Sequence, residues 1–334
     1  MKLAKVFVLT LVLLPCINLQ IAQPEQSSSS SGAGDFYKMG RTEFLKFTPQ
    51  GFQKAISDYE KALQADPNFA PAFAGLGEVY SFIGFYKSEV KEEYEEYFNK
   101  AYQNILQALK YGPNLVETQR ALAVNYLHLS RENDAEAAAI RVLQLDPNDA
   151  ESQYILWAAN GKNPNDPVIR KALTSDPNLV MAHVELATAY FFKANNYKKA
   201  AEHYRKAVEL ANSPQLRNYL GTTLRSQGYY NQAVAEYLIA LKQDPSYAAA
   251  QMNLGITLFY MNKFNESIDS LKKAISKNPN YPDGYFFIAE AYAKTNNPKL
   301  AMDYYKQFLD IVSNQDNYSG YISTAKKSMS KIQQ

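Results

Sequence analysis

A nine-residue pattern recurs six times along this chain of 334 residues. It first reads ALQADPNFA, and it returns as ALKYGPNLV, VLQLDPNDA, ALTSDPNLV, ALKQDPSYA and AISKNPNYP. Its prolines are separated by 46, 34, 30, 68 and 34 residues, which indicates an underlying period of 34. A fixed period of this size is typical of solenoids, in which each repeat buries its apolar face only against its neighbours.

Each copy of the pattern has the chemistry of a junction between two helices. The residue before a proline is pushed out of the α region, so we expect helices to end near Asp66, Asp146, Asp176 and Asp244. Proline does not continue a helix, and the Asn that usually follows it suits a turn or a cap. A new helix then starts two or three residues further on. The sequence therefore predicts an all-α fold.

Aligning the units on these prolines gives a common frame of packing positions. Leu or Ile occupies position 7 in seven units, and small residues recur at positions 8, 20 and 27. Small side chains there let two helices approach closely, while large residues pack as knobs. Position 8 reads Gly77, Ala123, Trp157, Ala187, Gly221, Gly255 and Ala289.

This frame resembles the tetratricopeptide repeat, a unit of 34 residues with two antiparallel helices, A and B. The resemblance implies a right-handed superhelix, an α-solenoid, of about eight helix-turn-helix repeats over residues 35–312. It implies a polar-faced capping helix over residues 313–334. Before the repeats we expect a signal peptide over residues 1–22 and a Ser-rich flexible linker over residues 23–34.

Two units depart from the regular length. The second gains twelve residues between Tyr86 and Ala101, which we expect to lengthen its helix B. The five glutamates in that insert predict a solvated helix face, and a site for a basic partner is the alternative. The fourth unit loses four residues, and Pro164 and Pro167 are expected to open a shortened helix B. Trp157, the only tryptophan, is expected to fill the space left there, with a ligand-binding role as the alternative.

The N-terminus predicts export. Lys2 and Lys5 precede the apolar stretch VFVLTLVLLP, which is too short to span a bilayer and is built like a secretory signal. The segment LLPC resembles the lipobox of bacterial lipoproteins, which makes Cys16 a candidate for lipidation; ordinary cleavage after Ala22 is the alternative. The expected location is the cell envelope, as a periplasmic or lipid-anchored protein, or the exterior.

The charge balance and the absence of catalytic and metal-binding motifs exclude several classes of function. Without Lys2 and Lys5 the 35 basic residues fall to 33, which equals the 33 acidic residues, so a nucleic-acid partner is not expected. The three histidines have no metal-binding spacing, and no nucleophile or phosphate-binding motif is present. One cysteine permits no internal disulfide. We expect a protein that is not an enzyme, with no cofactor or metal and with no membrane contact beyond a lipid anchor.

The resemblance implies a binding surface, because helix A of such repeats lines a concave groove through positions 2, 5, 6, 9, 12 and 13. Some relatives bind a carboxylate through Lys, Asn and Arg side chains at fixed places in consecutive repeats. Arg120 is the only arginine at position 5, so this carboxylate clamp is not matched, and the row of asparagines at position 6 found in other relatives is absent. We expect the groove to bind a protein or peptide. The alternative is an assembly subunit of an envelope complex that uses its convex face or its ends. The predicted groove residues are Phe191, Phe192, Asn218, Arg225, Met252, Asn253, Phe259 and Tyr260.

Overall fold

The computed structural model describes residues 31–89, 93–312 and 315–333. In these residues there are seventeen α-helices and one short 3₁₀ helix, and no strand, so the prediction of an all-α fold is confirmed. No helix in this described part is long and apolar enough to cross a membrane. The expected signal peptide, Cys16 and most of the Ser-rich linker lie outside the described residues.

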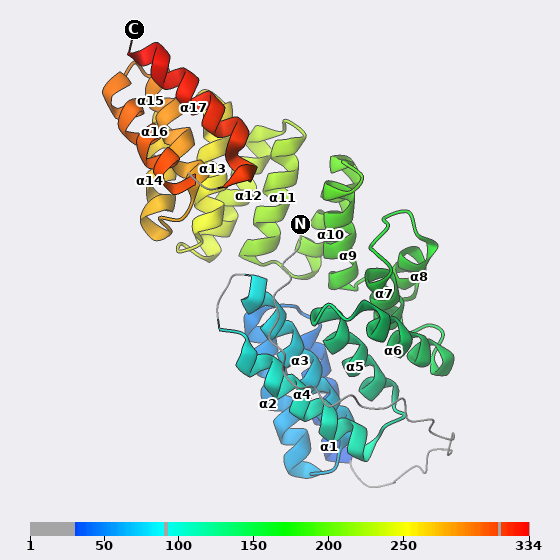
Figure 1. Ribbon diagram of the computed structural model, residues 1–334. Coiled ribbons are helices and arrows are strands. Elements are labelled where there is room, and N and C mark those ends of the chain that lie inside the picture. Colours follow the sequence, from blue (N-terminus) through cyan, green and yellow to red (C-terminus); the bar gives the residue numbers. More distant parts are fainter. Residues whose placement is uncertain (1–30, 90–92, 313–314, 334) are drawn as a thin grey trace.

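Sixteen helices form eight consecutive hairpins, which follow one another in a curved array with α17 at its far end (Figure 1). Odd-numbered helices are the A helices of the repeats and even-numbered helices are the B helices. The bounds are α1 (Ser31–Phe44), α2 (Pro49–Ala65), α3 (Ala70–Glu89), α4 (Glu95–Tyr111), α5 (Val116–His128), α6 (Glu132–Leu145), α7 (Ala150–Ala159), α8 (Pro167–Ser175), α9 (Val180–Phe192), α10 (Tyr197–Leu210), α11 (Pro214–Ser226), α12 (Tyr230–Gln243), α13 (Ala248–Tyr260), α14 (Phe264–Lys277), α15 (Pro282–Lys294), α16 (Pro298–Val312), the 3₁₀ helix η1 (Asp316–Tyr318) and α17 (Ser319–Ile332).

The recurring proline ends the B helices as the sequence predicts. Asp66, Asp146, Asp176 and Asp244 are C-cap residues, and each has an extended backbone conformation. The helix therefore stops one residue before the proline, where the proline ring disfavours the α conformation. The following turn then leads into the A helix of the next hairpin.

Small residues set the distance between the two helices of a hairpin. A Cβ atom added to Gly221 of α11 would lie 2.6 Å from the ring of Tyr237 in α12. One added to Gly255 of α13 would lie 2.6 Å from Leu271 in α14. Both distances are shorter than a carbon–carbon contact allows, so these sites accept no side chain while the large residue opposite keeps its place.

The structure corrects two expectations about segment boundaries. The insert of the second unit lengthens helix A more than helix B: α3 has 20 residues against 13 in α5, and α4 has 17 against 14 in α6. Helix A continues past Phe82 because the added turns find packing partners: the ring of Phe85 stacks on that of His128 at the end of α5, with centroids 4.8 Å apart. The flexible linker is shorter than predicted, since Ser31–Phe44 already form α1 and Ala33 is fully buried.

The fourth unit is short in both helices, with 10 residues in α7 and 9 in α8. Pro167 occupies the first position of α8, as expected, whereas Pro164 lies in the loop before the helix. Asp166 caps α8 by accepting from the amide of Val168. Trp157 is 1% exposed, and its Nε1 donates to the carbonyl of Asn163 at 2.7 Å. Its predicted burial is confirmed. Among consecutive α-helices described, α8 and α9 touch least.

We predict that Trp157→Ala destabilises the protein by about 3–5 kcal/mol, because it removes a large buried side chain and leaves a cavity at the junction with the fifth unit. Urea unfolding followed by circular dichroism measures this free energy without relying on tryptophan fluorescence. Lys171→Ala, on the exposed side of α8, is the control and should change stability by less than about 0.5 kcal/mol. Equal effects of the two substitutions would contradict the packing role of Trp157.

Candidate functional site

In the N-terminal half, groove positions of successive A helices hold charges that pair with one another. Arg41 of α1 bonds to Glu78 of α3 and to Glu151 of α7. Arg120 of α5 donates from Nε to Glu78 Oε1 at 3.1 Å and from Nη1 to Asp149 Oδ2 at 2.8 Å. Glu78 and Arg120 are both buried. These groups therefore satisfy one another and leave little free hydrogen-bonding capacity for a partner.

The attraction between opposite charges stabilises this network. Burial alone would raise the pKa of Glu151, but the guanidinium groups of Arg41 and Arg120 hold the pKa of this carboxyl below its usual range. The isolated Arg120 of the sequence is thus one member of a network that joins four A helices. Sequence reasoning missed it because the partners come from α1, α3 and α7, and Arg41 lies 110 residues before Glu151.

The C-terminal half of the groove presents aromatic rings instead. Phe192 at the end of α9 is 73% exposed and Tyr260 at the end of α13 is 49% exposed. Phe191 and Phe259 are half-buried beside them. Tyr219 of α11 is 45% exposed on the same series of A helices, although it was not among the predicted residues. Its place at position 6 of the repeat frame, a groove-lining position, is the sequence signal that could have identified Tyr219.

The remaining predicted residues are less accessible. Asn218 and Met252 are buried, whereas Asn253 and Arg225 are half-buried. The Asn253 side chain donates from Nδ2 to Oδ1 of Asn218 at 2.9 Å, which links α13 to α11. The methyl group of Met252 lies close to Gly284 of α15. Asn218 and Met252 thus hold neighbouring A helices together beneath the exposed rings.

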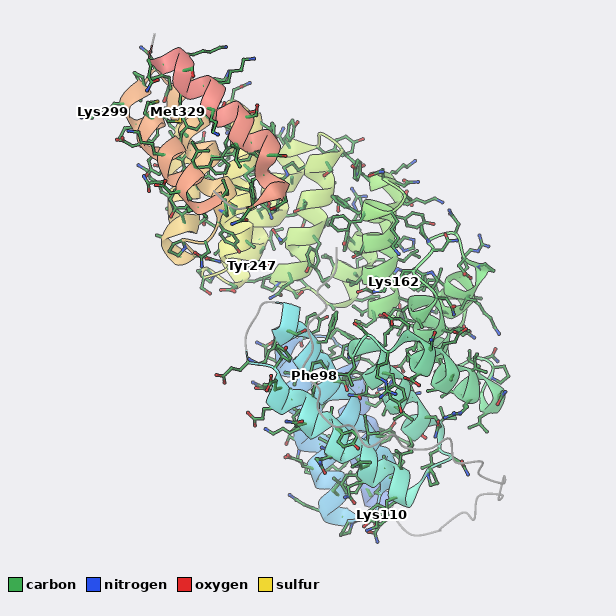
Figure 2. All side chains as sticks on the ribbon, viewed as in Figure 1. Phe98, Lys110, Lys162, Tyr247, Lys299 and Met329 are labelled. Carbon is green, nitrogen blue, oxygen red and sulfur yellow. The ribbon has the colours of Figure 1, made fainter. Side chains whose placement is uncertain are left out.

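An ion pair joins the fourth and fifth units beside this groove. Lys162, in the loop before α8, lies near α9 (Figure 2), and its Nζ is 2.7 Å from Oε2 of Glu185. Glu185 occupies groove position 6 of α9. Its carboxylate also interacts electrostatically with the hydroxyl groups of Tyr86 and Tyr154. The middle of the groove is therefore rich in tyrosine around one paired carboxylate.

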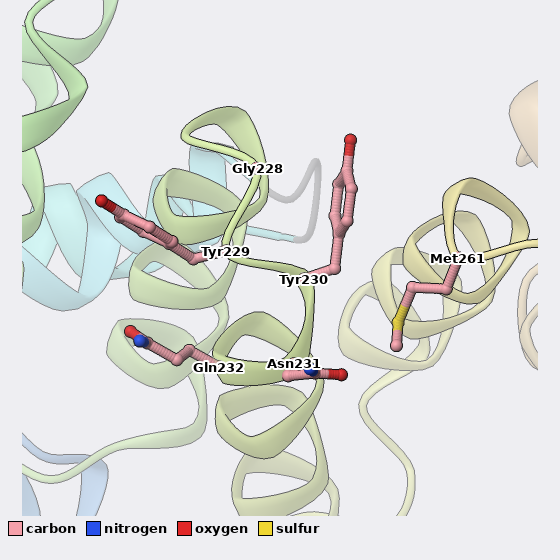
Figure 3. Close-up of a pocket in the computed structure, with 6 residues that line it drawn as sticks. All are labelled: Gly228, Tyr229, Tyr230, Asn231, Gln232 and Met261. Carbon is pink, nitrogen blue, oxygen red and sulfur yellow. The ribbon is translucent and has the colours of Figure 1, made fainter.

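A shallow hollow of about 300 Å³ lies at the rim of the groove, where α11 turns into α12. In Figure 3, Tyr230 and Met261 stand on one side of it and Tyr229 and Gln232 on the other. The ring of Tyr230 stacks on that of Tyr260, with centroids 6.2 Å apart and planes 9° from parallel. The hollow extends the aromatic part of the groove and is lined by Gly228, Tyr229, Tyr230, Asn231, Gln232 and Met261.

The histidines lie inside the helical packing. His183 Nε2 lies 3.1 Å from the carbonyl oxygen of Pro177 and its Nδ1 lies 3.0 Å from His203 Nδ1, so one ring of the pair donates to the other. Burial, together with the nearby His183 and Lys199, lowers the pKa of His203 to about 4. Within the described ranges, no group of three or more His, Cys, Asp or Glu side chains is placed to hold a metal ion.

Comparison with known proteins identifies the repeats. A family model described as TPR repeat matches residues 221–261 and 257–296, and one described as Tetratricopeptide repeat matches residues 182–214 and 282–313. The crystal structure of the APC/C hetero-tetramer Cut9-Hcn1 superposes with a TM-score of 0.59 at 18% identity, covering 88% of this chain and 55% of that chain. That likeness shows the fold. The chain therefore contains tetratricopeptide repeats over residues 182–214 and 221–313, and it has the α-solenoid fold.

Two curated relatives show the range of proteins that share the repeats. The type IV pilus assembly protein PilF of Pseudomonas aeruginosa is 31% identical over 145 residues, which are 42% of this chain and 56% of that protein. Tetratricopeptide repeat protein 6 of Homo sapiens is 23% identical over 228 residues, which are 68% of this chain and 36% of that protein. This chain therefore spans between about a third and just over half of these relatives.

The buried charge network generates a stability prediction. Arg120→Met should destabilise the protein by about 3–5 kcal/mol, because it leaves the buried carboxylate of Glu78 with one cation fewer. The matched control is Arg141→Met on the exposed side of α6, which should change the free energy of unfolding by less than about 0.5 kcal/mol. Urea unfolding at pH 7 measures both. A stable Arg120→Met protein would show that the network is not needed for packing of the first four hairpins.

The histidine pair predicts a pH dependence. The imidazole of His203 stays neutral in the folded protein, so protonation favours the unfolded chain. Stability should therefore be complete above pH 6.5 and decline as the pH falls from 6.5 towards 4. NMR titration of the imidazole C2 proton should give a midpoint near 4 for His203. A midpoint near 6.5 would contradict the burial of this ring, and His203→Gln should weaken the decline in stability.

Proposed function

We propose that this protein is an exported scaffold that binds a protein or peptide segment in the concave groove of its C-terminal half. One observation carries the proposal. The three most exposed aromatic side chains among the described residues, Phe192, Tyr229 and Tyr260, all lie at the ends of A helices or in the A-to-B turn of units five to seven. Clustered exposed aromatic surface marks interaction sites, because such surface is otherwise kept away from water.

The chemistry of this surface suits a peptide. Aromatic rings supply apolar contact area at a low cost in conformational entropy, and they are enriched in the centres of protein interfaces. The half-buried Asn253 and Arg225 add hydrogen-bonding groups that suit a peptide backbone or a side chain. The N-terminal half contrasts with this, because its groove charges already pair among themselves.

Export is the second part of the proposal. The lysine-flanked apolar stretch before Cys16 supports secretion, and a relative named for type IV pilus assembly supports an envelope location. Intact mass of the mature protein tests this. A diacyl or triacyl cysteine at Cys16 establishes a lipid anchor, whereas an N-terminus at Gln23 establishes ordinary cleavage. A mature chain that still begins at Met1 would contradict export.

An assembly role through the convex face remains the alternative function. Leu238 and Ile239 of α12 are 53% and 38% exposed, and Leu145 at the end of α6 is 56% exposed. The third hairpin contains α6 and the sixth contains α12, with two hairpins between them, so these residues do not form one continuous patch. The aromatic groove is the stronger candidate for this reason.

Alanine substitutions distinguish the two functions once a partner has been recovered by pull-down from an envelope extract. Phe192→Ala and Tyr260→Ala should each weaken binding by about 2 kcal/mol, because exposed rings of this kind act as interface hot spots. Leu238→Ala on the convex face and Glu95→Ala at the start of the second unit's helix B should leave affinity unchanged. Isothermal titration calorimetry measures these affinities. The reverse pattern would establish the convex face or the insert as the site.

A further inference from the structure

Arg225, near the end of α11, is a half-buried cation without a carboxylate partner. Its Nη1 atom is buried and makes no hydrogen bond, and the structure places no described carboxylate within ion-pair distance of its guanidinium group. Every other described arginine that is buried or half-buried has such a partner: Arg41, Arg120, Arg131 and Arg217. A buried donor without a partner is unfavourable, and it is commonly explained by a ligand or an ordered water.

The surroundings of Arg225 are aromatic. It occupies position 12 of its A helix, and the equivalent residues on the neighbouring A helices are Phe191 of α9 and Phe259 of α13. The adjoining position 13 holds the exposed rings of Phe192 and Tyr260. The guanidinium group therefore lies between two aromatic pairs, in a part of the groove where water is partly excluded and charge interactions are strong.

Asp283 is a carboxylate that interacts electrostatically with Arg225. It lies in the first turn of α15, beyond ion-pair distance, and has no hydrogen-bond partner in the described part of the chain. Burial raises the pKa of Asp283, and Arg225 partly offsets that effect. Asp283 therefore competes weakly with any anion that approaches Arg225, and removal of its charge should change the affinity for that anion.

We infer that Arg225 is the receptor for an aspartate or glutamate side chain of the peptide partner, whose apolar residues lie against Phe192 on one side and Tyr260 on the other. This inference rests on the proposed function and names the chemistry of its partner. The planar guanidinium group matches a carboxylate with two parallel hydrogen bonds. A single cation suits one carboxylate, whereas a polyanion is bound by several basic residues.

The spacing of the A helices predicts the sequence that the groove selects. Packed helices lie roughly 8–10 Å apart, and an extended peptide advances roughly 3.3 Å per residue. The acidic residue should therefore have an apolar or aromatic residue about three positions away on the side of α13, which packs on α11, and one at least that far away on the side of α9. Selection of a random dodecapeptide phage library on the full chain tests this motif.

Point variants measured with a selected synthetic peptide test the role of Arg225 directly. Arg225→Gln should weaken binding by about tenfold or more, the loss expected for a desolvated charged hydrogen bond. Replacing the acid of the peptide by its amide should give the same loss, and the two changes together should not add. Asp283→Asn should strengthen binding about threefold, because it removes the competing charge. Arg205→Gln, on the exposed side of α10, is the matched control and should have no effect.

The outcomes separate this inference from the proposed function. Charge reversal by Arg225→Glu should be rescued by a peptide with lysine in place of the acid, which a purely structural role of Arg225 would not produce. Peptides that lose binding on Tyr260→Ala but bind Arg225→Gln normally would overturn the acid receptor and leave the groove function intact. Selected peptides that are insensitive to both Phe192→Ala and Tyr260→Ala would overturn the groove function and the inference together.

Discussion

The close approach of helix A to helix B, made possible by small residues at three repeat positions, underlies the rest of this structure. At Gly221 and Gly255 the facing side chains Tyr237 and Leu271 occupy the space where a Cβ would lie. Each hairpin is therefore a compact unit with one apolar side for the hairpin before it and one for the hairpin after it. Stacking eight such units places the A helices in one series, which carries the groove positions predicted from the repeat frame.

The same scaffold carries two different surfaces along that series. In the N-terminal half, Glu78 of α3 accepts from both Arg41 of α1 and Arg120 of α5, and these bonds stabilise the stack of A helices. In the C-terminal half, the equivalent helices present rings such as Phe192 and Tyr260 to solvent. The short fourth unit lies at the boundary between the two surfaces, where α8 packs only loosely against α9. The chain thus combines a stabilised half with a half that is suited to recognition.

The sequence was sufficient for the architecture because repeat packing is local. The period of the prolines and the small residues gave the number of hairpins and the burial of Trp157. Helix lengths were harder to predict: the insert of the second unit extends helix A, since Phe85 of the added turns stacks on His128 of α5, a contact between repeats that no local pattern reveals. The charge network and the missing partner of Arg225 depend on distances between separate helices. Such distances are set by stacking, so sequence alone did not predict them.

The central claim is that a partner lies against the groove of units five to seven. Photo-crosslinking tests it most directly, with p-benzoylphenylalanine placed at Phe192 in the groove and, as the matched exposed site on the convex face, at Leu238. Illumination in the native cell extract should give a discrete covalent adduct from position 192 and none from position 238. An adduct from position 238, with none from position 192, would contradict the account and assign recognition to the convex face.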